Sequence, residues 1–154
     1  MAPNDSPKLR LPIQIVGRVD VSRLLRELEA LEESLDQASI RKSEAGAVLT
    51  RNRRLLEELA SSNSLNLLQS EHRKQAQSFL KVILDSAPMV HISFASNPSA
   101  AFTSKIITWF RNNIHEYTLL NVGLEPSIAA GCIVRTNNRQ FDFSLRQHFA
   151  DNQK

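Results

Sequence analysis

Apolar residues recur every three or four positions in the amino-terminal half of the chain. After Asp20 they follow a 3-4-3-4-3 spacing, at Val21, Leu24, Leu28, Leu31, Leu35 and Ala38. This spacing predicts an amphipathic helix, capped by Asp20, with one apolar seam. The seam spans only about two and a half heptads, fewer than a coiled coil needs. We therefore interpret it as packing in a helix hairpin or bundle, with a partner-binding seam formed by Leu24, Leu28, Leu31 and Leu35 as the alternative.

The helical pattern continues with two interruptions. It breaks around Ser43–Gly46, resumes near Val48, and breaks again at Ser61–Ser64. A third helix is expected from about Leu65 until Pro88 stops it, with its apolar side formed by Leu68, Ala76, Phe79, Leu80 and Ile83. Residues 20–87 are thus expected to form a helical region of about three helices. The preceding residues 1–19, which include Pro3 and Pro7, are expected to be disordered or extended.

The period of the apolar pattern changes from helical to alternating near residue 88. Val90, Ile92 and Phe94 alternate with polar residues, which predicts a half-buried strand. Asn97-Pro98 then resembles a helix cap followed by proline at the first helical position. The next helix carries an apolar stripe that we assign to the core, formed by Phe102, Ile106, Trp109 and Phe110. A second strand is expected from Tyr117 to Val122.

The last thirty residues predict a turn, two short strands and the start of a helix. Pro126 suits the second position of a tight turn after Glu125. Ala129, Ala130 and Gly131 are small enough for another backbone to come close. The apolar run 132–134 predicts a strand that contains the single cysteine, Cys132, as a small buried hydrophobe.

A two-residue turn is expected at Asn137-Asn138, and Phe141 and Phe143 share one face of the returning strand. Ser144 and Gln147 fit a capping box for a last helix. The whole chain is therefore expected to have an α+β fold, with a small domain at 88–154 that contains a mixed sheet of about four strands and two helices.

The order of residues from 125 to 146 resembles the carboxy-terminal domain of the delta subunit of rotary ATP synthases, the oligomycin-sensitivity-conferring protein of mitochondria. In that family an acidic-Pro-Ser turn leads to a Gly pair, an apolar strand ending in Arg, and an Asp-x-Ser-x-Arg motif. Here Glu125 replaces Asp and Ala130-Gly131 replaces the Gly pair, while Ala95-Ser96 stands where the family has a similar turn. The residues that carry this signature are Glu125, Pro126, Ser127, Gly131, Arg135, Asp142, Ser144 and Arg146.

The resemblance implies a peripheral-stalk (stator) subunit of a proton-translocating ATP synthase, which links the catalytic head to the b-type stalk subunits. It implies no catalytic residues and no cofactor, b-type and alpha subunits as partners, and a peripheral location on the cytoplasmic face of the cell membrane. The family carries an amino-terminal bundle of six helices, whereas this chain has room for about three. Contact with the b-type subunits is therefore better supported than contact with the head.

Two alternatives stay open. The chain could be a helical adaptor or regulatory binding module whose second domain only shares the local pattern. It also has the plan of the stalk E subunit of vacuolar-type enzymes, with a helical arm before an α/β domain.

Composition and charge narrow the range of functions. The net charge is +3 with a pI of 9.4, too weakly basic to indicate nucleic-acid binding. The cluster Arg51, Arg53 and Arg54 is interpreted as a solvated helix face, with an acidic partner surface as the next choice. No apolar run reaches the ~20 residues that span a bilayer, so membrane association is expected only through partners.

The sequence offers no convincing catalytic or metal-binding pattern. The four histidines, His72, His91, His115 and His148, have no ligand spacing. The chain contains no P-loop and no dinucleotide-binding fingerprint. Ser144 stands near Asp142 and His148, but a helix cap explains it better than a catalytic triad does. We therefore expect a non-catalytic protein without cofactors or metals.

Overall fold

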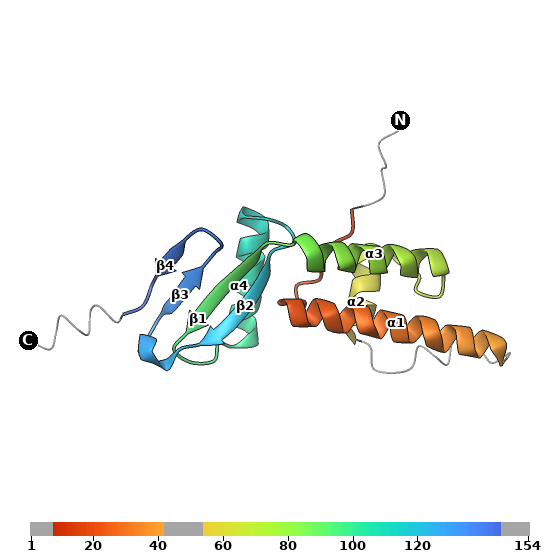
Figure 1. Ribbon diagram of the computed structural model, residues 1–154, viewed down its shortest axis with the longest axis horizontal. Coiled ribbons are helices and arrows are strands. Elements are labelled where there is room, and N and C mark those ends of the chain that lie inside the picture. Colours follow the sequence, from red (N-terminus) through yellow and green to blue (C-terminus); the bar gives the residue numbers. More distant parts are fainter. Residues whose placement is uncertain (1–7, 42–53, 146–154) are drawn as a thin grey trace, which may run out of the picture. The chain divides into compact units, whose positions relative to one another are not determined.

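The computed structural model describes residues 8–41 and 54–145 and shows an α+β protein. The chain forms two compact units, one of residues 1–15 and 19–86 and the other of residues 16–18 and 87–154. We call them the helical unit and the sheet unit (Figure 1). The longer segment of the sheet unit begins at residue 87, one residue before the boundary at residue 88 that the change of period suggested. In the described parts of both units, no helix has the length and hydropathy needed to cross a membrane.

The described part of the helical unit contains α1 (Arg18–Ile40), α2 (Arg54–Asn63) and α3 (Ser70–Ser86). The buried positions of α1 are those of the expected seam, Val21, Leu24, Leu28, Leu31, Leu35 and Ala38. The helix starts at Arg18, three residues earlier than expected, so Asp20 lies in its first turn and is not the N-cap. A carboxylate at that position still interacts favourably with the helix dipole.

The segment before α1 packs into the helical unit without forming a helix or strand, so of the two expected states, disordered or extended, disorder does not apply to residues 8–15. Leu9, Leu11 and Ile15 are buried. The Asn63 side chain at the end of α2 accepts from the Arg10 amide at 2.6 Å and donates to the Arg10 carbonyl at 2.9 Å. The apolar residues at positions 9, 11, 13 and 15 alternate with other residues, which indicates an extended segment with one packed side. The nearby prolines favoured the expectation of disorder instead.

The third helix begins later than expected, at Ser70 instead of about Leu65, and Leu68 is exposed in the preceding loop. The buried Arg73 explains this loop, because its Nη1 donates to the carbonyls of Leu67 and Leu68 at 3.0 and 2.9 Å. One guanidinium thus satisfies two carbonyls of a non-helical turn. Arg73 Nε also lies 3.9 Å from Glu32 Oε1 on α1, which links the two helices.

The sheet unit contains β1 (Met89–Phe94), α4 (Ala100–Asn113), β2 (Leu119–Leu124), the short 3₁₀ helix η2 (Pro126–Ile128), β3 (Cys132–Arg135) and β4 (Gln140–Asp142). The strand order is β2-β1-β3-β4, with β1 parallel to β2 and antiparallel to β3. A parallel pair needs a crossover connection, which α4 provides. The expected mixed sheet of four strands is confirmed, and the expected last helix lies outside the described residues.

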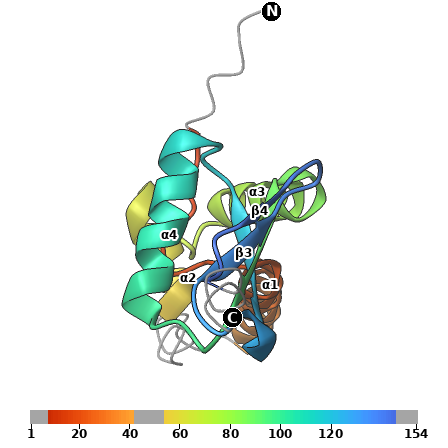
Figure 2. The ribbon, with the colours of Figure 1, turned by 90° about the vertical axis from the view of Figure 1, so that its left-hand side faces the viewer.

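Helix α4 packs against one face of this sheet (Figure 2). The core between them consists of Val90, Ile92, Phe94, Ile107 and Leu120. The N-cap of α4 is Ser99, whose Oγ accepts from the Phe102 amide at 3.2 Å, and not Asn97 as expected. Pro98 therefore precedes the cap. The β3–β4 turn is formed by Asn137 and Asn138 as expected, and Thr136 N donates to Arg139 O at 2.8 Å across it.

Candidate binding site at the end of the sheet

The loop after β2 turns sharply because of Pro126, which occupies the first position of η2. The Ile128 amide donates to the Glu125 carbonyl at 3.0 Å, and Ser127 Oγ donates to Glu125 Oε1 at 3.2 Å. The Ile128 side chain is fully buried and anchors the loop in the protein interior. The first three signature residues therefore build one turn, as the sequence indicated.

Gly131 is required by a close approach of the backbone. Its φ is +91°, and a Cβ at this position would lie 2.2 Å from the Phe143 carbonyl oxygen. The two segments are joined by hydrogen bonds from Phe143 N to Cys132 O (2.9 Å) and from Leu145 N to Ala130 O (3.0 Å). The expectation that another backbone comes close here is confirmed, and the approaching segment belongs to this chain. Ala129 also has a positive φ of 66°, which is a strained conformation for a residue with a Cβ.

The second half of the signature forms a local turn beside this contact. Asp142 Oδ1 accepts from the Ser144 amide at 2.8 Å. Burial and the neighbouring Asp142 carboxylate raise the pKa of the half-buried Cys132 thiol. Arg135 lies at the end of β3, where its Nε donates to Gln140 Oε1 at 3.1 Å. The alternation of Asp142, Ser144 and Arg146 along the chain predicts that their side chains meet on one side. Arg146 lies outside the described residues, so this stays a prediction.

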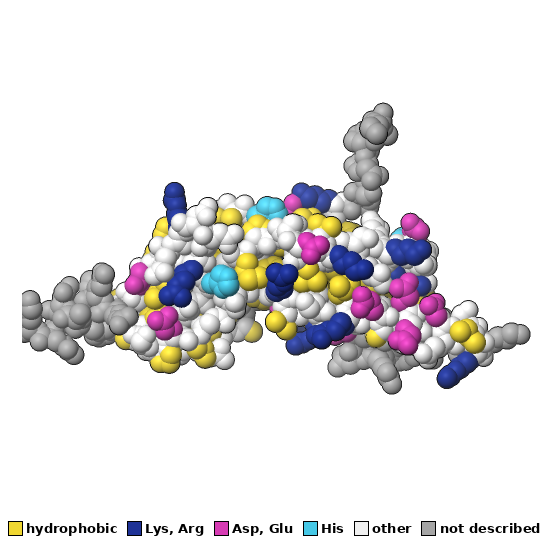
Figure 3. All heavy atoms as spheres, viewed as in Figure 1, with side chains coloured by type: hydrophobic (Ala, Val, Ile, Leu, Met, Phe, Trp, Pro, Cys, Tyr) yellow, Lys and Arg dark blue, Asp and Glu magenta, His cyan; other side chains and the backbone are white. Residues whose placement is uncertain are grey.

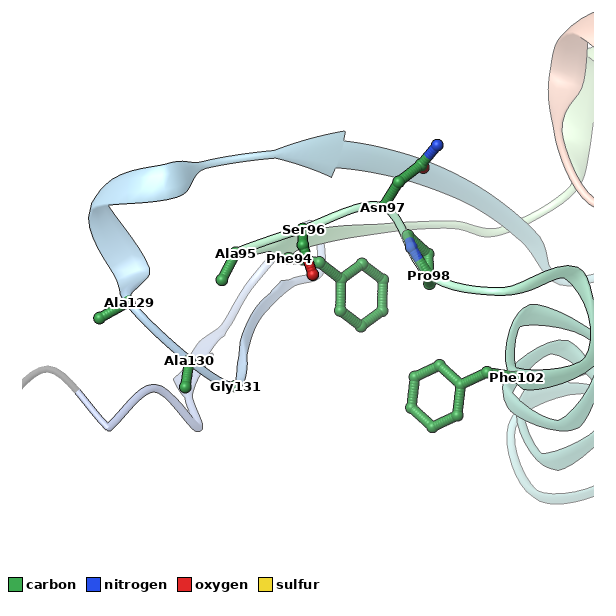
Figure 4. Close-up of a pocket in the computed structure, with 9 residues that line it drawn as sticks. All are labelled: Phe94, Ala95, Ser96, Asn97, Pro98, Phe102, Ala129, Ala130 and Gly131. Atoms are coloured by element: carbon green, nitrogen blue, oxygen red, sulfur yellow. The ribbon is translucent and has the colours of Figure 1, made fainter.

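The two segments that carry the resemblance meet at one pocket, although about thirty residues separate them in sequence. The pocket has a volume of about 310 Å³ (Figure 4) and is lined by Phe94, Ala95, Ser96, Asn97, Pro98, Phe102, Ala129, Ala130 and Gly131. The rings of Phe94 and Phe102 make an edge-to-face contact with centroids 6.0 Å apart. In Figure 4 the Asn97 amide points away from these two rings. The pocket is therefore a hollow of mixed polarity, made of small residues, two polar side chains and two aromatic rings.

The expected core stripe of α4 is confirmed in part. Ile106 and Phe110 pack against the core, whereas Phe102 and Trp109 lie on the outer face of the helix, which corrects their assignment to the core. Phe102 and Trp109 are 48% and 55% exposed, while Ile106 and Phe110 are half-buried. Ile107 is the fully buried residue of the helix. The helix contacts the sheet along one side only. Ile107 lies at the centre of that side, although it was not among the four residues of the expected stripe. Phe102 and Trp109 lie seven positions apart, so they point in nearly the same direction.

The charge on α4 is exclusively basic. Its sequence contains no Asp or Glu, and Lys105 is exposed between Phe102 and Trp109. Arg111 donates from Nε to the Thr118 carbonyl at 3.2 Å. Burial lowers the pKa of Arg111 to about 10. Lys105 is thus the exposed basic residue of α4 beside Phe102 and Trp109.

The seam residues of α1 form no exposed surface. Leu24, Leu28 and Leu31 are fully buried and Leu35 is 9% exposed. They pack inside the helical unit, where Gln77 of α3 donates to Glu32 of α1 at 2.7 Å. The alternative of a partner-binding seam is therefore corrected, because this chain covers the seam itself.

The histidines and the arginine cluster considered in the sequence do not gather at one place in the described residues. His72 Nδ1 accepts from the Asn66 amide and His115 Nδ1 from the Tyr117 amide, so both support loops. Arg54 is exposed and pairs with Glu58 at 3.2 Å, whereas Arg51, Arg53 and His148 lie outside the described residues. Within residues 8–41 and 54–145, no three His, Cys, Asp or Glu side chains gather as a metal site.

No known protein-family model matches this chain, and no curated protein matches it significantly.

Proposed function

We propose that this protein is a peripheral-stalk (stator) subunit of a rotary proton-translocating ATP synthase and acts by binding alone. It links the catalytic head to the b-type stalk subunits on the cytoplasmic face of the cell membrane, which it reaches through its partners. Two findings support the proposal. The helical unit precedes a four-stranded mixed sheet, which is the plan that the resemblance implies. The two segments that carry the resemblance also line one pocket.

The observation that carries the proposal is the exposed apolar face of α4, formed by Phe102 and Trp109 and continued by the pocket. The two side chains lie about 10 Å apart along the helix axis, two turns of α-helix. Apolar residues at this spacing are typical anchors for a partner helix. Tryptophan is also among the residues that contribute most to protein interfaces.

The charge of α4 indicates what kind of helix binds there. Lys105 stands between the two aromatic residues, and α4 contains no carboxylate that would repel an acidic partner. Complementary charges across an interface favour the correct partner and exclude others. A b-type stalk subunit with an apolar stripe and acidic flanks on its carboxy-terminal helix satisfies this requirement.

Binding can be measured directly, because Trp109 is the single tryptophan of the chain. The probe is a synthetic peptide of the carboxy-terminal helix of the b-type subunit from the same organism. Adding it to the full-length protein should shift the Trp109 emission to shorter wavelength, since the indole leaves water. With a fluorescently labelled peptide, Trp109→Ala and Phe102→Ala should each weaken binding by about tenfold or more.

The matched control is Val82→Ala. Val82 is 59% exposed on α3 and lies outside the proposed interface, so its truncation should leave the affinity unchanged. Equal effects of Trp109→Ala and Val82→Ala, or no peptide binding by the full-length protein, would refute the α4 interface.

The stator role is tested in membranes. Removing residues 124–154, which deletes β3 and β4, should uncouple or release the catalytic head while the detached head still hydrolyses ATP. Coupled synthesis that survives this deletion, or ATP hydrolysis by the purified chain, would exclude the stator and favour the adaptor alternative.

A further inference from the structure

On the face of the sheet opposite to α4, polar side chains belong to two rows across the strands, beside the buried Leu119 and Ile133. The strand register aligns Asn121, His91, Arg135 and Gln140 in one row and Gly123, Ser93, Ile133 and Asp142 in the next. Figure 3 views this side of the sheet and shows histidine and basic side chains on the surface over the strands, with acidic side chains nearby. His91, Asn121 and Arg135 are all exposed.

A hollow of about 210 Å³ lies on this face, lined by His91, Ser93, Asn121, Gly123 and Arg135. Three neighbouring strands, β2, β1 and β3, contribute these residues. Gly123 stands opposite Ser93 in the register, and its missing side chain leaves space over β2. The volume is below the ~300–1,000 Å³ of pockets for drug-sized ligands, so it admits a small group.

Two hydrogen bonds orient side chains around the hollow. Asn121 Nδ2 lies 3.1 Å from His91 Nδ1. With the amide as donor, Nδ1 accepts, and the neutral imidazole carries its proton on Nε2. Arg135 uses Nε to bond Gln140 Oε1 at 3.1 Å, which orients the guanidinium and leaves its terminal Nη groups for other acceptors.

None of the residues that line the hollow is acidic. The charged side chains on this face of the described strands are Arg135 and Asp142. Asp142 stands in the second row, beyond Ile133, and its Oδ1 already accepts from the Ser144 amide at 2.8 Å. The hollow therefore combines Arg, His, Ser and Asn groups that can donate hydrogen bonds to an anion.

We propose that this hollow binds a phosphate-type oxyanion, with Arg135, His91 and Ser93 as its donors. A tetrahedral anion has oxygens for donors that approach from three strands, whereas a planar carboxylate matches the arginine fork alone. The group can come from free phosphate or from the headgroup of an acidic phospholipid. The site lies on the opposite side of the sheet from α4, so it is independent of the proposed stator interface.

The test uses full-length ¹⁵N-labelled protein titrated with inorganic phosphate at constant ionic strength. The Arg135 Nε–H and the amides of Ser93 and Gly123 should shift along a saturating curve with a dissociation constant of about 1 mM. Acetate should produce no saturating shift. An equal response to acetate, or no saturation with phosphate, would overturn the proposal.

One arginine variant and one arginine control distinguish a specific phosphate site from nonspecific attraction between phosphate and positive charge. Arg135→Gln should weaken phosphate binding by about tenfold or more, because it removes charge-assisted hydrogen bonds. Arg139→Gln removes the same charge from the exposed β3–β4 turn and should change the affinity by less than about twofold. Equal effects of the two arginine variants would refute the site.

Gly123→Ala tests the hollow without a change of charge. The added methyl group would lie 3.5 Å from Ser93 Oγ, an ordinary contact, so the variant should fold normally. It should still weaken phosphate binding by about tenfold, because it fills the space over β2. Unchanged affinity in a folded Gly123→Ala protein would contradict the proposal.

Vesicles distinguish the two sources of the anion. Arg135-dependent sedimentation with phosphatidylglycerol vesicles, but not with phosphatidylcholine vesicles, would assign the site to a lipid headgroup. Phosphate binding without vesicle binding would assign it to free phosphate.

Discussion

The helical unit and the sheet unit use their apolar stripes differently. In α1 every expected seam position is buried, from Val21 to Ala38. In α4 two of the four expected positions, Phe102 and Trp109, are about half exposed. Both stripes have the same helical spacing. A helix seam in a bundle is covered by neighbouring helices, whereas a helix on one face of a sheet is covered on one side only. The periodicity therefore identifies an amphipathic helix but not the depth to which its stripe is buried.

The largest expected difference between the units concerns truncation of these stripes. Leu31→Ala in the seam should lower the free energy of unfolding by about 2–5 kcal/mol, because it leaves a cavity in a closed core. Trp109→Ala should lower it by about 1 kcal/mol or less, since the indole is already half in water. Urea unfolding followed by circular dichroism measures both. Similar losses in the two variants would show that α4 is buried as deeply as α1.

The next prediction concerns the glycines of the sheet unit. Gly131→Ala should destabilise the protein by about 2–4 kcal/mol, because the new Cβ would collide with the Phe143 carbonyl and φ is positive. The matched control is Gly123→Ala, whose Cβ meets ordinary contacts and should cost about 1 kcal/mol or less. Thermal unfolding of the two variants distinguishes them. A tolerated Gly131→Ala would mean that residues 131 and 143 do not approach each other.

A smaller effect is expected at the signature turn. Asp142→Ala should lower stability by about 0.5–2 kcal/mol, because it removes the bond from the Ser144 amide. Gln140→Ala, two residues earlier on the exposed edge strand, is the control and should have less effect. Unchanged stability with loss of complex assembly would assign Asp142 to an interface instead.

The smallest expected effect is on the reactivity of Cys132. Because burial and Asp142 raise the pKa of its thiol, the folded protein holds less thiolate than the unfolded chain at pH 8.5. Alkylation by iodoacetamide at that pH should be slower in native protein than in urea, and Asp142→Asn should accelerate it modestly. The same shift means that this group's contribution to stability falls as the pH rises above ~8.5, where the unfolded thiol ionises first. Equal alkylation rates in native and unfolded protein would contradict the shift.

The candidate site was only partly predictable. The Glu125–Ser127 turn, the need for a small residue at Gly131 and the Asn137-Asn138 turn follow from local backbone chemistry, and the structure has all three. The meeting of Ala95–Pro98 with Ala129–Gly131 could not be predicted, because it depends on the pairing of β1 with β3. The alternation of Leu9, Leu11 and Ile15 is visible in the sequence. That this segment is held in place by hydrogen bonds between the Asn63 side chain and the Arg10 backbone could not be predicted, because Asn63 is distant in the chain.

The sequence by itself determined the α+β class, the change from helical to alternating period near residue 88, and the seam of α1. These are local properties, set by which side chains a helix or strand places on one face. Tertiary structure decided the start of α3, because Arg73 satisfies the carbonyls of Leu67 and Leu68 only when it is buried. It also decided that Phe102 and Trp109 face outward and that His91, Ser93 and Arg135 share one hollow. Burial and the pairing of distant strands depend on the whole fold, and no short segment encodes them.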